Sequence, residues 1–194
     1  MTRREATGRL VARLRDHAVV ASLGHPAYDL FLAGDRPANF YTWGSMGLTS
    51  SIALGIALAR PDCPVVALDG DGSLLMNLGS LATIGACSPA NLLVVVWDNE
   101  QYGTTGGQPT ATSLGADLAA AARAMGLDAT AVTTAEQFDR ALDRADESRR
   151  ATVIVAKVEE SIPGGRPPLD CVFIKQRFMA AIGACEPGTR GAGA

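Results

Sequence analysis

The most constraining feature of this sequence is an uninterrupted apolar run, LLVVV, inside a predicted strand at residues 91–97. Continuous β-branched runs of this kind are typical of parallel strands that are buried on both faces. Similar short runs at residues 18–23, 65–68 and 152–158 predict further strands, and stretches with a helical pattern separate them. This alternation predicts βαβ units, and therefore an α/β fold with a mainly parallel sheet flanked by helices.

The remaining segments follow from the same patterns. Residues 134–148 are a predicted helix, in which Thr134 and Gln137 are expected to form a capping box. A further strand is predicted at residues 129–132 and an extended segment at 40–43. The other predicted helices cover residues 2–16, 27–33, 44–60, 73–84, 115–125 and 170–184, and the predicted loops cover residues 103–112 and 161–168.

A chain of 194 residues has the length of one domain. We predict a single domain over residues 1–185 and a disordered tail over residues 186–194. Hydrophobic residues make up 47% of the chain but aromatic residues only 5%, so the core is expected to consist of Ala, Val, Leu and Ile. Such small side chains allow helices to approach a sheet closely.

Charge and cysteine usage argue against several classes of protein. The net charge is −3 and the only lysines are Lys157 and Lys175, so the sequence has no basic stripe for nucleic acid. The four cysteines lack C-x-x-C spacing, which favours reduced thiols in a cytosolic protein over a zinc site. Residues 1–14 show no signal-peptide core, and no apolar run is long enough to span a membrane. We therefore expect a cytoplasmic protein. The cysteines are Cys63, Cys87, Cys171 and Cys185.

The motif DGDGS, residues 69–73, lies where a predicted strand meets a predicted helix. Sheets of α/β proteins bind ligands at this position, outside the carboxyl ends of their strands. The two glycines permit a tight turn, and the free N–H groups at the start of a helix attract phosphate. Asp71 adds a hard oxygen ligand, which indicates a bridging divalent cation such as Mg²⁺. The alternative interpretation is a surface Asp-Gly turn.

Two other motifs are excluded by spacing. A calcium-binding EF-hand loop that began at Asp69 would need Gly at its sixth position and Glu at its twelfth, where Leu74 and Ser80 stand. A dinucleotide-binding fingerprint would need a third glycine at the position of Leu75.

A second candidate ligand follows the next buried strand, which leads into WDNEQYG at residues 97–103. Neighbouring parallel strands end side by side, so Asn99 is expected beside Asp71 at the carboxyl edge of the sheet. A carboxylate, an amide oxygen and a nearby backbone carbonyl form half of a coordination shell for Mg²⁺. Diphosphate oxygens and water would complete this shell.

Together these segments resemble a known family. The GDG motif, a helix, a strand and then the asparagine are similar to the cofactor-binding domain of thiamine-diphosphate enzymes such as pyruvate decarboxylases and acetolactate synthases. Over nearly its whole length the chain most resembles the sulfopyruvate and phosphonopyruvate decarboxylases. The segments that carry the resemblance are GSMGL at residues 44–48, GDGSLLMNLGSLATI at 70–84 and WDNEQYGTTGGQ at 97–108.

The resemblance implies a thiamine-diphosphate-binding (PP-type) domain with thiamine diphosphate and Mg²⁺ as cofactors. Asp71 and Asn99 would bind the cation through their side chains, and Gln101 through its backbone carbonyl. Gly72 and Ser73 would bind the diphosphate. The full set of cofactor-binding residues that it implies is His25, Gly44, Ser45, Met46, Gly70, Asp71, Gly72, Ser73, Asn99, Gln101 and Tyr102.

Two of these residues would act on the reactive end of the cofactor. The carbonyl of Gly44 would accept a hydrogen bond from the 4′-amino group of the aminopyrimidine. Met46 would be the apolar wedge that folds the cofactor into its V shape; the alternative is a core methionine at the start of a helix. His25 matches a position near the diphosphate, although a surface-loop histidine is an open alternative.

The resemblance also implies a partner. In this family a glutamate on a separate pyrimidine-binding domain protonates the aminopyrimidine ring, and no glutamate of this chain has a suitable place. Glu100 lies beside the metal site on the diphosphate side. The other glutamates fall on predicted helix faces or a late loop: Glu5, Glu136, Glu147, Glu159, Glu160 and Glu186. We therefore expect a β-type subunit that needs an α-type, pyrimidine-binding subunit. Alone, the chain is expected to form homo-oligomers or to bind the cofactor weakly.

The expected activity is decarboxylation of a small anionic 2-oxoacid of the sulfopyruvate or phosphonopyruvate type. Leu48 stands where we expect histidine in the phosphonopyruvate decarboxylases. Thr104, Thr105 and Gln108 are candidates for substrate contact, and a linker is the alternative for these loop residues. Two other functions stay open: a carboligase subunit like that of acetolactate synthase, and a non-catalytic cofactor-binding or regulatory subunit. Residues 47–59 form a predicted helix that is apolar on nearly every face, which indicates an interior or an interface.

Overall fold

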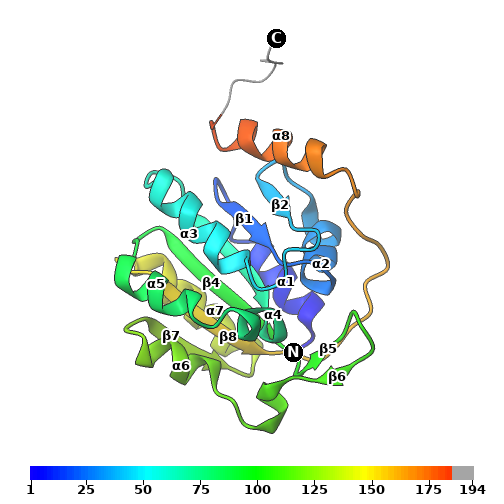
Figure 1. The fold of residues 1–194 in the computed structure, drawn as a ribbon, viewed down its shortest axis with the longest axis vertical. Helices are drawn as coiled ribbons and strands as arrows, with labels where there is room; N and C mark the ends of the chain where they lie inside the picture. Colours follow the sequence, from blue (N-terminus) through cyan, green and yellow to red (C-terminus); the bar gives the residue numbers. More distant parts are fainter. Residues whose placement is uncertain (185–194) are drawn as a thin grey trace.

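The computed structural model describes residues 1–184. Its centre is a six-stranded sheet in the order β2-β1-β3-β4-β8-β7, and every pair of neighbouring strands is parallel (Figure 1). This confirms the expected α/β fold with a parallel sheet. The strands are β1 (Ala18–Ala21), β2 (Asn39–Tyr41), β3 (Val65–Gly70), β4 (Leu92–Asp98), β7 (Asp128–Val132) and β8 (Thr152–Lys157).

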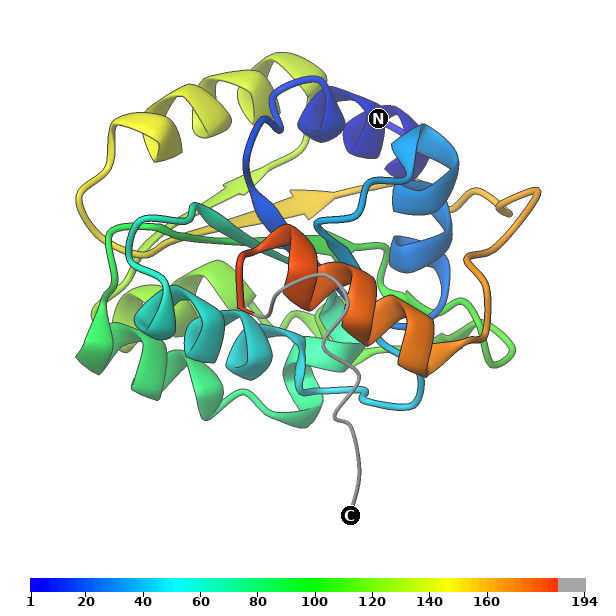
Figure 2. The same cartoon turned by 90° about the horizontal axis from the view of Figure 1, so that it is seen from above.

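Helices cover both faces of the sheet, and Figure 2 shows the resulting three layers. One face carries α1 (Arg3–Val11), α2 (His25–Gly34) and α7 (Ala135–Glu147), and the opposite face carries α3 (Thr49–Ala59), α4 (Asp71–Met76), α5 (Ser80–Cys87) and α6 (Leu118–Ala124). The last helix, α8 (Cys171–Ala181), packs at the β2 edge, where Phe178 contacts Phe40.

The two faces explain the continuous apolar run in β4. Val94 and Val96 belong to the core beneath α3, α5 and α6, whereas Val95 and Trp97 belong to the core beneath α1, α2 and α7. Successive side chains of a strand point to opposite faces, and here both faces are covered. Each position in the run is therefore apolar.

Glycines correct the predicted start of two helices. The helix predicted at residues 44–60 begins at Thr49, because Gly44 and Gly47 have φ angles of 78° and 84°, which a right-handed helix does not allow. The helix predicted at residues 115–125 begins at Leu118, because Gly115 has a φ of 101°. The Asp117 side chain caps α6 by accepting from the N–H of Ala120.

Three other predicted segments also differ. The helix predicted at residues 73–84 is two helices, since α4 ends at Met76 and α5 begins at Ser80 after Asn77 and Gly79, residues with low helix propensity. The predicted loop 103–112 contains β6 (Gln108–Pro109), which pairs antiparallel with β5 (Gln101–Tyr102), and a 3-10 helix, η1 (Ala111–Leu114). The first helix ends at Val11 rather than at residue 16.

The predicted capping box of α7 is confirmed, with Thr134 and Gln137 as its members. Cys63, Cys87 and Cys171 are free thiols. Cys185 and the predicted tail over residues 186–194 lie outside the described residues. Among residues 1–184, none of the helices combines the length and apolar character that crossing a bilayer requires.

Candidate functional site

A half-open pocket of about 90 Å³ lies at the carboxyl ends of β1, β3 and β4. Its walls come from the first turn of α4, the start of α2 and the hairpin of β5 and β6. The predicted site residues that line the pocket are His25, Met46, Gly70, Asp71, Gly72, Ser73, Asn99, Gln101, Tyr102, Thr104 and Thr105. Gly44, Ser45 and Gln108 are not among its lining residues.

Asp71 is the first residue of α4 and its side chain is 2% exposed. Its Oδ2 accepts hydrogen bonds from the hydroxyls of Thr110, at 2.5 Å, and Thr112, at 3.0 Å. Both hydroxyls lie on the same oxygen, so Oδ1 has no side-chain hydrogen bond within the described residues. Burial raises the pKa of Asp71, and the nearby charge of Asp98 raises it further. A buried carboxylate oxygen without a side-chain donor is suited to bind a cation.

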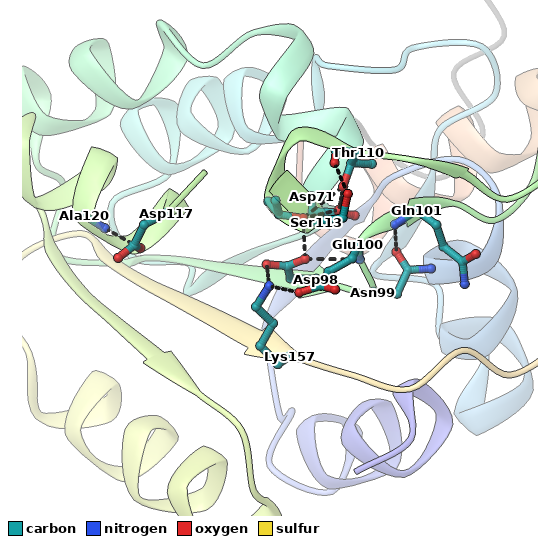
Figure 3. Close-up of polar contacts among 11 residues, drawn as sticks. Asp71, Asp98, Asn99, Glu100, Gln101, Thr110, Ser113, Asp117, Ala120 and Lys157 are labelled. Atoms are coloured by element: carbon teal, nitrogen blue, oxygen red, sulfur yellow. Dashed lines mark hydrogen bonds and ion pairs between the residues drawn. The ribbon is translucent and has the colours of Figure 1, made fainter. Parts of the chain in front are cut away.

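Asp98 ends β4 and is also 2% exposed. Its Oδ1 accepts from Thr112 at 2.8 Å, and its Oδ2 pairs with Nζ of Lys157 at 2.8 Å (Figure 3). Lys157 also pairs with Glu100 at 2.7 Å. The Thr112 hydroxyl carries a single proton, so it can donate to only one of its two carboxylate neighbours at a time. Lys157 balances the charge of Asp98, while Asp71 has no such partner within the described residues.

Asn99 follows β4 and lines the pocket beside Asp71. Its amide nitrogen donates to Oε2 of Glu160. The only contact to its Oδ1 within the described residues is a long one of 3.5 Å from the N–H of Gln101. Glu100 has a φ of 63°, a left-handed conformation that turns the chain sharply between Asn99 and Gln101.

Close packing explains two of the glycines. A Cβ at Gly72 would lie 2.3 Å from the ring of Tyr102, and one at Gly24 would lie 2.4 Å from the hydroxyl of Thr104. Only glycine allows the β5–β6 hairpin to lie this close to the two turns. The hydroxyl of Ser73 accepts from the N–H of Gly47 at 3.0 Å, so the turn after β3 is tied to the loop that carries Met46.

Asp69 is fully buried directly before this turn. Burial raises its pKa to about 6, although hydrogen bonds from Ser73 and from the N–H of Gly70 oppose the shift.

A cluster that the sequence interpretation missed borders the pocket. Arg3 is 2% exposed and donates from Nε to Asp29 at 2.7 Å and from Nη1 to Oε1 of Glu160 at 2.7 Å. His25 Nδ1 lies 2.9 Å from the same Oε1. Burial alone would raise the pKa of Glu160, but the bonds from Arg3 and Asn99 outweigh it and the pKa lies below its ordinary value.

Glu160 was expected in a late loop, unsuited to protonate the aminopyrimidine ring, and the structure brings this loop to the border of the pocket. The loop after β8 returns to the pocket because its backbone pairs with the N-terminus, where Arg3 donates its N–H to the carbonyl of Glu159 at 3.1 Å. In sequence, Arg3 and Glu160 are 157 residues apart. No periodicity or motif connects them, so sequence patterns could not have found this pair.

Comparison with known proteins identifies the class. Residues 27–156 match the family model described as thiamine pyrophosphate enzyme, C-terminal TPP binding domain. The chain belongs to this family, as the resemblance implied.

Two relatives with similar sequences are decarboxylases or subunits of decarboxylases. The chain is 43% identical over 171 residues to the sulfopyruvate decarboxylase subunit beta of Methanocaldococcus jannaschii, a match that covers 84% of this chain and 87% of that subunit. It is 41% identical over 192 residues to the phosphonopyruvate decarboxylase of Streptomyces viridochromogenes, which covers 97% of this chain but 48% of that enzyme.

A solved structure agrees in fold. The thiamine diphosphate-dependent 4-hydroxybenzoylformate decarboxylase of Rhodococcus jostii superposes with a TM-score of 0.71 at 22% identity. The match covers 83% of this chain and 33% of that enzyme. At this level of identity the likeness concerns the fold alone.

Proposed function

We propose that this chain is the β-type subunit of a thiamine-diphosphate- and Mg²⁺-dependent 2-oxoacid decarboxylase. The observation that carries the proposal is the placement of Asp71 and Asn99, each with an oxygen available, in one pocket of a TPP-binding domain. Gly70 and Trp97 are register partners on β3 and β4, so these two side chains follow strands that end side by side.

The residues present fit a hydrated divalent cation bound together with a diphosphate. Within residues 1–184, no three His, Cys, Asp or Glu side chains gather to hold a metal by themselves. Asp71, Asn99 and the carbonyl of Gln101 would supply only part of a shell, and a single carboxylate leaves positive charge unbalanced. Diphosphate oxygens supply both the missing ligands and the missing charge.

The rest of the cofactor would lie against this pocket and against the loop of Gly44 and Ser45, which do not line it. Gly72, Ser73 and His25 would hold the diphosphate, with Gly70 and Tyr102 beside it. Met46 would support the folded cofactor, and the Gly44 carbonyl, next to Ser45, would accept from its amino group. When bound, thiamine diphosphate supplies the electron sink for the charge that remains as CO₂ leaves. The protein's part is to orient the substrate and to exclude water.

The relatives support a small anionic substrate of the sulfopyruvate or phosphonopyruvate type. Three of the relatives are named subunit beta, which favours the two-subunit arrangement. Leu48, 47% exposed, would face the partner or the substrate. Thr104, Thr105 and Gln108 lie exposed on the hairpin, where they would contact the substrate.

The activating glutamate would come from the partner subunit. Glu160 is engaged by Arg3, His25 and Asn99, and Glu100 is paired with Lys157, so neither carboxylate is available to the aminopyrimidine. The reduced thiols and the absence of a basic stripe favour a cytoplasmic enzyme that binds no nucleic acid.

The test is reconstitution. The chain is purified alone and mixed with an α-type subunit, thiamine diphosphate and Mg²⁺, and CO₂ release from sulfopyruvate and from phosphonopyruvate is measured. We expect turnover only in the mixture. Robust turnover by the chain alone would contradict the need for a partner, and a product that forms only with an added aldehyde would indicate carboligation instead.

A further inference from the structure

We propose that Glu160 is a positioning residue for Asn99, and that Arg3 and His25 hold Glu160 in place for this purpose. The inference rests on the proposed function, in which the Asn99 side-chain oxygen binds the cation.

The hydrogen bond between Glu160 and Asn99 decides which end of the amide faces the pocket. An asparagine side chain has one donor end and one acceptor end of nearly the same shape, so without a partner either end can face a ligand. An ionised carboxylate only accepts. Because Oε2 of Glu160 accepts from Nδ2 of Asn99, Oδ1 is the amide atom left for a cation. A flipped amide would present an NH₂ group, which cannot ligate a metal.

Glu160 itself is fixed from the other side. Its Oε1 accepts from Nη1 of Arg3 at 2.7 Å and lies 2.9 Å from Nδ1 of His25. Arg3 is in turn anchored by Asp29 and by the carbonyl of Ser161. The carboxylate therefore has charged or polar partners on both oxygens, and it cannot rotate away from Asn99 without breaking these bonds.

Arg3 also reduces the electrostatic repulsion that the Glu160 carboxylate would exert on a diphosphate in the pocket. A bare negative charge beside a diphosphate site would repel the ligand that the site has to bind. The buried guanidinium, which also pairs with Asp29, offsets part of the charge of Glu160 and leaves its hydrogen-bonding direction unchanged. Partners that hold a metal ligand in this way commonly change metal affinity by roughly 10- to 100-fold when they are replaced.

The experiment uses the full chain and two matched controls. In Glu160→Gln the carbonyl oxygen is expected to face Arg3, which can only donate, so that the NH₂ group faces Asn99 and the acceptor there is lost. Asp29→Asn is the same chemical change on the other buried partner of Arg3 and does not touch Asn99. Glu159→Gln changes the adjacent carboxylate, whose side chain is 77% exposed. Mg²⁺ is titrated calorimetrically at a fixed, millimolar concentration of thiamine diphosphate, and the melting temperature of each free chain is recorded.

We expect Glu160→Gln to weaken the apparent Mg²⁺ affinity roughly 10- to 100-fold. Asp29→Asn keeps an oxygen that can accept from Nε of Arg3, so it is expected to lower the melting temperature but to change the Mg²⁺ affinity by less than about threefold. Glu159→Gln is expected to change neither quantity. In an Asn99→Ala background, Glu160→Gln should add little further loss, because its effect passes through Asn99. A merely structural role would give the same loss in both backgrounds.

Unchanged Mg²⁺ affinity in Glu160→Gln would overturn the inference about Glu160 but not the proposed function. The same holds if Glu160→Gln lowers the Mg²⁺ affinity as much in the Asn99→Ala background as in the wild type. A wild-type chain whose binding of thiamine diphosphate does not depend on Mg²⁺ would overturn the proposed function with it. If Glu160→Gln does not fold, Glu160→Asp takes its place. Aspartate keeps the charge that Arg3 needs but is one methylene too short to reach both Arg3 and Asn99, so the same loss of affinity is expected.

Discussion

The hydroxyl of Thr110 donates a hydrogen bond of 2.5 Å to Oδ2 of Asp71, from 39 residues further along the chain. Thr110 lies between β6 and η1, and Asp71 opens α4, so this bond joins the hairpin to the turn after β3. It engages one carboxylate oxygen and thereby leaves the other available to the pocket. The cation site that we propose depends on this contact as much as on the aspartate itself.

Replacing Asp71 by alanine tests the metal site. We expect Asp71→Ala to abolish Mg²⁺-dependent binding of thiamine diphosphate, with an affinity loss above the roughly 100-fold that a supporting residue can cause. Asn99→Ala removes a neutral ligand and should act more mildly. Asp62→Ala, which removes an exposed carboxylate at the opposite edge of the sheet, is the control. Cofactor titration at fixed Mg²⁺ measures all three, and wild-type affinity in Asp71→Ala would refute the assignment.

Thr112→Val tests the bridge between the two buried carboxylates. The change keeps the shape of the side chain but removes the hydroxyl that lies within 3.0 Å of both Asp71 and Asp98. We expect the free energy of unfolding to fall by about 1–3 kcal/mol, since a buried carboxylate loses one of its hydrogen-bond donors. Urea denaturation provides the measurement. Thr130→Val, on the distant edge strand β7, should lower the free energy of unfolding much less. Equal losses in the two variants would show that the hydrogen bonds of Thr112 add no stability.

Met46→Ala tests the wedge in the reconstituted enzyme. Met46 lines the pocket from the loop before α3 and has an apolar side chain, so its loss should misplace the cofactor without releasing its charged end. We expect kcat to fall about 10- to 100-fold while the cofactor affinity changes little. Met125→Ala, a partly buried methionine of the core, should lower stability but leave kcat unchanged. A folded Met46→Ala variant that no longer binds cofactor would assign Met46 a different role.

His17 provides a prediction of pH dependence far from the site. Burial lowers its pKa, an effect that Arg36 reinforces and Asp146 opposes, and Nδ1 accepts from the N–H of Arg15 at 3.2 Å. The neutral ring is therefore favoured in the folded state. The stability that it contributes is present above the ordinary histidine pKa of about 6.5 and is lost as the pH falls through the lower folded value.

Comparison of wild type with His17→Gln isolates this contribution. We expect the difference between their free energies of unfolding to shrink as the pH is lowered from about 7.5 to about 5. Urea denaturation at several pH values measures it. A difference that is constant over this range would show that burial of His17 does not perturb its titration.

The fold and the family could be predicted from local signals. The LLVVV run predicted a strand covered on both faces. Strand β4 has this arrangement, because exposure of either row of its apolar side chains to water would be unfavourable. The DGDGS turn and the asparagine after the next strand predicted that Asp71 and Asn99 would lie at the same end of the sheet, because parallel strands end at a common edge. Helix ends were predicted less well, since Gly44, Gly47 and Gly115 adopt positive φ angles and the sequence does not show which glycines do so.

The sequence by itself determined the layers of the fold and the family, and it predicted the residues that we propose for cofactor binding, because these depend on side-chain types at short spacings. Only the tertiary structure decided how those residues are held. Thr110 donates a hydrogen bond to Asp71, and Arg3 forms an ion pair with Glu160, which is 157 residues away in the sequence. Such contacts depend on where the chain returns after folding, and their free energies arise from burial and charge pairing between segments that share no local pattern.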